Sequence, residues 1–312
     1  MVRIILLVVC ILTFLKINGQ VVDKIDIKLL TSDLQKKQAV VIMMKDQSDI
    51  SMVNQIHGKD NKATFVYNTL YQKAQTSQAS LIQFLSAKGV TYRSFYIVNM
   101  LSAALDFELI KQVASRDDVQ EVVQDGSFKM LDQPEGDRSH NGGNRAPIWN
   151  ITHIGAPTVW GMGYSGQNVV IGGQDTGYAW DITPIKSKYR GWNGTTANHN
   201  YNWHDAIHQI DTHNSGSNPC GFNSTVPCDD DNHGTHTMGT MVGSVDNNGQ
   251  EIGVAPAAKW IGCRNMERGW GTLTSYVECF EWFLAPYPLA GGAGDPTKMP
   301  HVINNSWGCP TS

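Results

Sequence analysis

The stretch CDDDNHGTHTMGTMVG, residues 228–243, places His233 directly after three aspartates and an asparagine. A histidine in this setting could bind a metal, transfer a proton or pack in a core. His233 and His236 are three residues apart and would share one face of a helix, as two zinc ligands can. The run lacks the glutamate and the spacing of an HExxH zinc motif, and no second pair of ligands accompanies it. Metal binding is therefore the weaker alternative, and no metal ligand is assigned.

Proton transfer by His233 accounts for more of the surrounding residues. Three glycines in the run keep the helix slim enough to pass close to its neighbours and hold His233 at its first turn. There the helix dipole disfavours the imidazolium, whereas a facing carboxylate favours it and fixes the tautomer. Asp175 is the expected partner, because DTG at 175–177 follows the apolar stretch NVVIGG and lies at the end of a buried strand. His236 is expected to pack or hydrogen-bond behind the site.

The DTG tripeptide also occurs in aspartic peptidases. Their mechanism needs two carboxylates that share a proton, and no second DTG or DSG occurs in the chain. This alternative would require a symmetric dimer.

The elements that must position these residues divide into two units of different composition. All nine tryptophans lie from Trp149 onward, where strands, loops and helices alternate as in an α/β protein with a parallel sheet. The earlier unit, 20–130, has strands at 39–44, 91–98 and 119–123 and two helical segments between them, which predicts a small α+β domain. No catalytic motif is visible in it. Residues 131–147 are rich in proline, glycine and charge, and predict an exposed linker.

The N-terminus predicts secretion. Arg3 precedes an apolar run over residues 4–15 that is too short to span a bilayer, so residues 1–19 read as a cleaved signal peptide. We expect an extracellular protein with no membrane attachment after cleavage; an uncleaved anchor is the alternative. The net charge of −4 and the absence of a basic stripe disfavour nucleic acid as a partner.

Secretion in turn predicts oxidised cysteines, of which five lie beyond the signal peptide. Cys220 and Cys228 flank a short loop and form the first expected pair. Cys263 and Cys279 form the second. Cys309 is then left without a partner in this chain.

Four motifs occur in a fixed order: DTG at 175–177, HGTHTMGT at 233–240, IGVAPAAKW at 252–260 and VINNSWG at 302–308. Together they resemble the subtilisin-like serine peptidases, and the longer match resembles the bacillopeptidase F-like branch of that family. The resemblance covers residues 149–312, and the earlier unit is similar to the inhibitory propeptide of such zymogens, a ferredoxin-like domain.

The resemblance implies an α/β fold and a catalytic triad in the chain order Asp, His, Ser. Asp175 would orient the histidine and His233 would be the general base. The family's GTSMA motif, which carries the nucleophile, and its AGN motif, which supplies an oxyanion donor, are both absent from the 312 residues. Ser306 is no substitute, because the family uses that segment to bind substrate. We therefore interpret residues 148–312 as an incomplete peptidase domain, inactive alone, at the N-terminal part of a secreted endopeptidase zymogen.

The resemblance also implies how a polypeptide substrate is held, as an added strand between two edges. One edge contains Gly269 and Gly271, and the other contains Ser306, Trp307 and Gly308. Ordinary turn glycines are the alternative for the first edge.

Catalysis of this kind requires no cofactor. Calcium remains a candidate structural ion at the loop 245–253, where Asp246 and Asn247 offer oxygen ligands; a solvated turn is the alternative.

A second function from another class fits the missing serine. The chain could be a non-catalytic peptide-binding pseudoprotease, or a protease inhibitor whose working part is the first unit. In the peptidase interpretation that unit is the enzyme's own intramolecular inhibitor. The intact Asp175 and His233 favour the peptidase.

Overall fold

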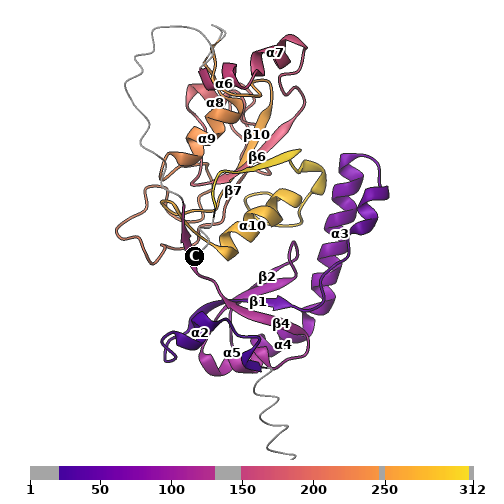
Figure 1. Cartoon of the computed structure of the whole chain (residues 1–312), viewed down its shortest axis with the longest axis vertical. Helices are drawn as coiled ribbons and strands as arrows, with labels where there is room; N and C mark the ends of the chain where they lie inside the picture. Colours follow the sequence, from indigo (N-terminus) through magenta and orange to yellow (C-terminus); the bar gives the residue numbers. More distant parts are fainter. Residues whose placement is uncertain (1–20, 131–148, 246–249, 309–312) are drawn as a thin grey trace, which may run out of the picture. The chain divides into compact units, whose positions relative to one another are not determined.

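The computed structural model describes residues 21–130, 149–245 and 250–308. The predicted signal peptide, the linker, Asp246, Asn247 and Cys309 lie outside these ranges. The chain forms two compact units, the first made mainly of residues up to Gly126 and the second mainly of residues from Ser127 onward (Figure 1). Within the described residues, no helix is both long enough and apolar enough to cross a membrane.

The first unit is built on a four-stranded antiparallel sheet with the strand order β2-β3-β1-β4. With its helices, the chain order is β-α-β-β-α-β, which is the ferredoxin-like arrangement. The elements are α2 (Ile27–Thr31), β1 (Gln38–Met44), η1 (Ser51–Gln55), α3 (Lys59–Ser77), α4 (Ala79–Ala87), β2 (Tyr92–Phe95), β3 (Met100–Leu105), α5 (Phe107–Ala114) and β4 (Val119–Gln124).

The core of this unit lies between the sheet and the helices α4 and α5. Alternate residues of β1 point into it, and the helices contribute residues at helical spacing. Fully buried members include Val40, Ile42, Leu81, Leu85, Ile110 and Val113.

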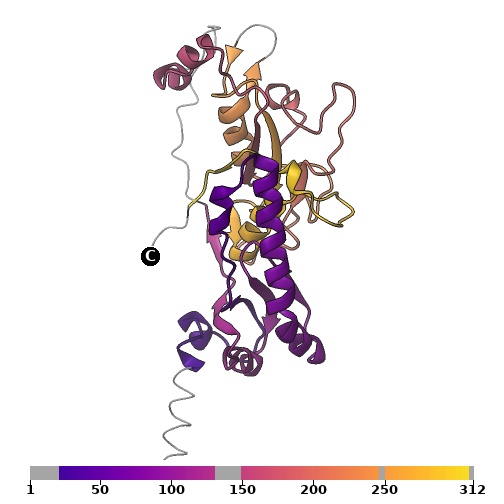
Figure 2. The same cartoon turned by 90° about the vertical axis from the view of Figure 1, so that its right-hand side faces the viewer.

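Two features of this unit differ from the sequence prediction. The strand β3 was missed, although it lies between β1 and β2 in the sheet. The helical segment before β2 is broken into α3 and α4 at Gln78, and α3 extends beyond the sheet (Figure 2). The side chain of Gln78 is fully buried, and its amide donates to the carbonyl oxygen of Phe95 and to Asn99 Oδ1, both at 2.8 Å. The break thus lets a polar side chain donate hydrogen bonds to buried acceptors in the turn between β2 and β3.

The second unit contains the predicted parallel sheet, with the strand order β12-β6-β10-β7. Its strands are β6 (Val170–Asp175), β7 (Trp203–Asp205), β10 (Lys259–Arg264) and β12 (Val302–Asn305). The helices α9 (His233–Val242) and α10 (Leu273–Leu284) cover its two faces (Figure 1). Side chains alternate along β10, so Trp260 packs with α9 and Ile261 packs with α10. The α/β fold expected from the sequence is confirmed.

Short elements and two disulfides complete this unit. The elements are α6 (Trp149–His153), α7 (Ala156–Gly161), α8 (Thr183–Lys186), β8 (Ser244–Val245), β9 (Gln250–Glu251) and η2 (Pro296–Lys298). Both expected disulfides are formed: Cys220 with Cys228 in a long loop, and Cys263 of β10 with Cys279 of α10.

A small two-stranded sheet begins the second unit. The strand β5 (Ser127–Lys129) pairs antiparallel with β11 (Trp270–Thr272), so that Phe128 lies opposite Gly271. The backbone N–H of Met130 then donates to the carbonyl oxygen of Gly269 at 2.7 Å. The sequence grouped residues 127–130 with the first unit, whereas this pairing places them in the second.

Candidate active site

Asp175 and His233 meet at the carboxyl edge of the parallel sheet. Asp175 is the last residue of β6, and His233 is the first residue of α9. His233 Nδ1 lies 2.7 Å from Asp175 Oδ1. Asp175 is 1% exposed and His233 is 8% exposed. The structure therefore brings together the two residues to which the sequence assigned catalytic roles.

Two glycines allow the strand end and the helix to approach this closely. Gly177 has φ +110°, and a Cβ atom there would collide with the carbonyl oxygen of Cys228. A Cβ atom on Gly234 would collide in turn with the carbonyl oxygen of Gly177. A side chain at Gly177 would displace the segment that leads into the helix, and a side chain at Gly234 would push the helix itself away from the end of β6. The glycines of DTG and HGTH are thus required by the distance between the acid and the base.

The carboxylate of Asp229 fastens the start of α9 to the residue after Asp175. Asp229 Oδ2 accepts a hydrogen bond from the backbone N–H of Thr235 at 2.8 Å, as a helix-capping group does. Asp229 Oδ1 accepts one from Thr176 Oγ1, also at 2.8 Å. The hydroxyl of Thr176 accepts the N–H of Gly234 at 3.0 Å. Of the three aspartates that precede this helix, Asp229 links the helix to the residue after Asp175.

The environment of His233 favours its protonated form. The hydrogen bond from Nδ1 to Asp175 raises the pKa of His233 above its usual value, and burial opposes this only in part. The charges of Asp175, Asp231 and Asp229 raise it further. The bond also defines the tautomer of the neutral ring, because a carboxylate only accepts and Nδ1 must carry the hydrogen. In the neutral ring Nε2 is then the nitrogen without a hydrogen, so it is the one at which the ring can be protonated.

The sequence reasoning overlooked a third residue beside this pair. Thr237, one turn into α9, directs its hydroxyl to Asp175 Oδ2 at 3.3 Å. Its position four residues after His233 is the signal that could have found it, because such residues share a helix face. The same hydroxyl lies 2.9 Å from the carbonyl oxygen of Gly234, so these two acceptors share its one hydrogen.

The expectation for His236 is wrong. Its side chain is exposed on α9, whereas His233 is buried. Three residues along a helix leave two side chains about 60° apart around the axis and almost one turn apart along it. In α9 this offset is enough to place His236 at the solvent while His233 is buried. Among the residues that the structure describes, no group of three or more His, Cys, Asp or Glu is arranged to hold a metal ion.

The two predicted peptide-binding edges have different partners. Gly269 and Gly271 lie on either side of Trp270 in β11, and β5 occupies that edge. Gly271 must be a glycine, since a Cβ atom there would lie 2.7 Å from the carbonyl oxygen of Asn265. In the described part of the chain, no strand pairs with Ser306–Gly308, which follows β12.

Side-chain contacts hold the segment Ser306–Gly308 beside the sheet. Trp307 stacks on Tyr276 with ring centroids 4.2 Å apart and donates from Nε1 to the carbonyl oxygen of Gln174 at 3.2 Å. Ser306 Oγ accepts a hydrogen bond from Asn304 Nδ2 at 2.8 Å. This segment thus lies near the end of β6.

A buried polar network connects the β11 edge to the residues before His233. Asn218 Nδ2 donates to Glu267 Oε1 and Asp230 Oδ2, each at 2.7 Å. Asp230 Oδ1 accepts the backbone N–H of Arg268 at 3.0 Å, where Arg268 has φ +49°. Burial raises the pKa of Asp230 to about 6, although Asn218 and Arg264 oppose it. The turn that leads into β11 is therefore held by side chains from the loop before α9.

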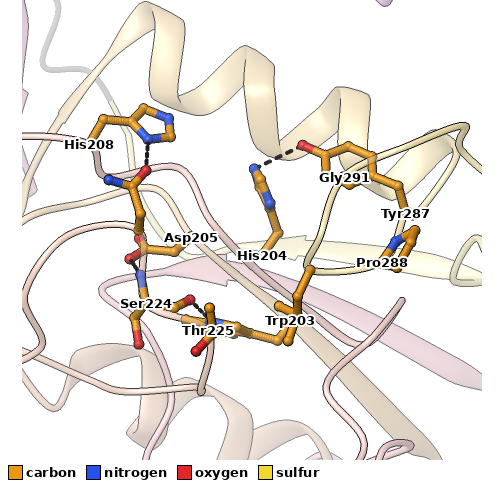
Figure 3. Close-up of a pocket in the computed structure, with 11 residues that line it drawn as sticks. Trp203, His204, Asp205, His208, Ser224, Thr225, Tyr287, Pro288 and Gly291 are labelled. Atoms are coloured by element: carbon orange, nitrogen blue, oxygen red, sulfur yellow. Dashed lines mark hydrogen bonds between the residues drawn. The ribbon is translucent and has the colours of Figure 1, made fainter.

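A second histidine–carboxylate cluster lies elsewhere in this unit, beside a pocket of about 150 Å³ (Figure 3). His204 Nε2 lies 2.8 Å from Glu278 Oε1, and His208 Nε2 lies 3.0 Å from Glu278 Oε2. His208 Nδ1 also lies 2.5 Å from Asn223 Oδ1. The sequence showed no sign of this cluster, because Glu278 lies about 70 residues after the two histidines in the chain.

Comparison with known proteins identifies the second unit. Residues 166–312 match the family model described as the subtilase family, Peptidase S8. These residues form a subtilase domain. Bacillopeptidase F of Bacillus subtilis (strain 168) is 32% identical over 264 residues, which are 79% of this chain and 17% of that protein. The chain thus spans about a sixth of the length of this relative.

Two solved structures share lower similarity with the chain. The epidermin leader peptide processing serine protease from Staphylococcus aureus has a TM-score of 0.48 at 12% identity, covering 78% of this chain and 46% of that one. Fervidolysin from Fervidobacterium pennivorans, a keratinolytic enzyme related to subtilisin, has a TM-score of 0.47 at 11% identity, covering 87% and 36%. The identification of the subtilase domain rests on the family model and on the curated relative.

Proposed function

We propose that the chain is the N-terminal part of a secreted serine endopeptidase zymogen. The observation that carries the proposal is the buried Asp175–His233 hydrogen bond of 2.7 Å within a subtilase domain. The serine is expected from sequence outside these 312 residues, since they contain no GTSMA motif. The chain alone would then hydrolyse no peptide.

In the proposed reaction, His233 and Asp175 move and stabilise one proton. His233 Nε2 takes the proton of the serine hydroxyl as the oxygen attacks the peptide carbonyl carbon. The imidazolium is stabilised by Asp175, whose carboxylate remains ionised. His233 then returns the proton to the amine nitrogen as the peptide bond breaks. A water molecule repeats the sequence to release the acyl group.

The pairing of β5 with β11 supports two further parts of the proposal. An extended segment adds to an exposed strand through main-chain hydrogen bonds, which is how a polypeptide substrate would bind at Gly269–Gly271. Because that segment follows directly on the first unit, the same contact would place part of the propeptide on the substrate edge. The first unit would then be the enzyme's intramolecular inhibitor. The two disulfides are in keeping with secretion.

The test is peptide hydrolysis by a protein that joins this chain to the natural continuation of its reading frame. We expect activity that phenylmethylsulfonyl-type serine reagents abolish and that a chelator of catalytic zinc leaves in place. Hydrolysis that resists the serine reagent and disappears with the chelator would contradict the proposal.

A peptide-binding protein without catalysis is the second candidate. Its support is that an extended segment, β5, pairs with the edge of β11, while the 312 residues lack the serine motif. The transcript beyond the codon for Ser312 separates the two candidates. A serine motif downstream supports the peptidase, and a stop codon at that point in every transcript supports the peptide-binding protein.

A further inference from the structure

The loop between β7 and α9 brings a buried carboxylate to the peptide-binding edge. The side chain of Asp211 is 7% exposed, and its Oδ2 accepts a hydrogen bond from the hydroxyl of Ser127 in β5. Its Oδ1 accepts the backbone N–H of His213 at 2.9 Å and lies 2.8 Å from the ring nitrogen Nδ1. Ser127 is the residue of β5 that pairs with Thr272. A carboxylate from a distant loop thus contacts one defined side chain of the added strand.

Three contacts fasten this loop to β11 and to the turn before it. The ring of His213 lies flat on Trp270, with centroids 3.9 Å apart and planes at 4°. The backbone N–H of Asp211 donates to Glu267 Oε2 at 3.3 Å, and Asn214 Nδ2 donates to the carbonyl oxygen of Glu267 at 2.8 Å. Asp211 therefore keeps a fixed position relative to any strand that pairs with β11.

The chemistry of Asp211 restricts what it can face. Burial raises the pKa of this carboxyl, but the hydrogen bonds from Ser127 and His213 outweigh burial and leave the pKa below its usual value. The group is ionised at neutral pH and can only accept hydrogen bonds. A peptide side chain opposite Asp211 is bound more favourably if it carries a hydrogen-bond donor. An acidic side chain there is repelled at short range.

We infer that Asp211 determines specificity at the peptide-binding edge. It selects polypeptides that place a hydroxyl-bearing or positively charged side chain opposite Thr272, and it rejects those with Asp or Glu there. The inference rests on the proposed function, because residues 127–130 stand in for a bound peptide. Such a site lies apart from Asp175 and His233, and it acts on binding and leaves the chemical step unchanged.

The experiment uses the full 312-residue chain and the amide hydrogen exchange of Met130, whose N–H donates to Gly269 across the edge. We expect Ser127→Asp to lower the protection of this amide about tenfold, because the carboxylates repel each other. Ser127→Asn is the matched control, since it has the same shape without the charge and can donate to Asp211. Its protection should stay within about threefold of the wild type.

The same two Ser127 variants, made in an Asp211→Asn background, complete a double-mutant cycle. There Ser127→Asp and Ser127→Asn should exchange at the same rate. A tenfold difference that persists without the Asp211 charge would overturn the specificity role alone. A wild-type Met130 amide without protection would overturn both this inference and the peptide-binding edge of the proposed function. The exchange of Ile261 in the central strand reports that each variant remains folded.

Discussion

The second unit contains two histidine–carboxylate sites that differ in which ring nitrogen meets the carboxylate. At the first, Asp175 meets Nδ1 of one histidine, so in the neutral ring Nδ1 carries the hydrogen and Nε2 does not. At the second, Glu278 contacts Nε2 of both His204 and His208. Because Glu278 contacts Nε2 of both rings, it links α10 to His204 in β7 and to His208 in the loop that follows. A short distance is common to both sites, whereas burial and the ring nitrogen that meets the carboxylate differ: His233 is 8% exposed, and the side chain of His208 is 37% exposed. The proposed proton transfer uses the first arrangement, and we expect the second to act on stability.

The largest expected effect comes from removing the base at the first site. In the complete enzyme, His233→Ala removes the proton acceptor and should lower kcat by about 10⁶. His236→Ala, one turn further along α9 and exposed, is the matched control and should leave kcat unchanged. Hydrolysis of a peptide substrate by both variants measures the contrast. Full activity in His233→Ala would end the catalytic assignment of this residue.

Asp175→Asn should lower kcat by about 10⁴, because the remaining imidazole is held in the wrong tautomer. The loss should be smaller than for His233→Ala, since a base is still present. If the two losses were reversed in size, the roles of the two residues would have to be exchanged.

The same variant tests the pH dependence of the pair without any need for the serine. The pKa of His233 is raised above 6.5 in the folded chain by Asp175, so an NMR titration should show it fall in Asp175→Asn. A raised histidine pKa stabilises the fold fully below pH 6.5, and this contribution disappears as pH rises through the folded value. The loss of stability in Asp175→Asn should therefore be larger at pH 6 than at pH 9. An unchanged pKa would contradict the pairing.

At the second site the expected effect is on stability. Glu278→Gln replaces an acceptor of two imidazole donors with an amide that can accept only on one side, which should cost about 1–3 kcal/mol in the free energy of unfolding. Urea denaturation of the full chain measures it. Glu108→Gln makes the same chemical change at a 73% exposed side chain and should cost almost nothing. Equal effects in the two variants would show that the shared carboxylate does not crosslink the loop.

The smallest effect is expected at Thr237. Thr237→Val keeps the shape and removes the hydroxyl that donates to Asp175 Oδ2 at 3.3 Å, a long hydrogen bond. We expect a loss of about 0.5–1 kcal/mol in stability and a decrease of about threefold in kcat. Calorimetry and peptide hydrolysis measure the two quantities. A loss as large as that of Asp175→Asn would make Thr237 a full partner of the pair.

The sequence revealed the first site because its residues belong to local motifs. The DTG and HGTH patterns contain the glycines that the close approach of β6 and α9 requires. The motifs therefore indicate that Asp175 and His233 lie close together. The cluster around Glu278 has no such pattern, since loop, strand and helix meet only in the folded chain. The same is true of Asp211, whose partner Ser127 is 84 residues away.

The missed strand β3 shows a similar limit within the first unit. Its sequence MLSAAL consists largely of residues with high helix propensity. It forms a strand because β1 and β2 pair with it on both sides. Tertiary pairing therefore overrides the local preference. The strand 39–44, rich in β-branched residues, was found because propensity and pairing agree there.

The strand β5 is three residues long, and so few main-chain hydrogen bonds could hardly keep a separate peptide in place. Covalent attachment changes this, because a tethered segment acts at an effective concentration in the millimolar range. Cleavage of the chain after β5 would make the pairing of β5 with β11 bimolecular. The two strands would then dissociate on dilution. The fraction of β11 edges occupied by β5 would then depend on the concentration of the cleaved strand.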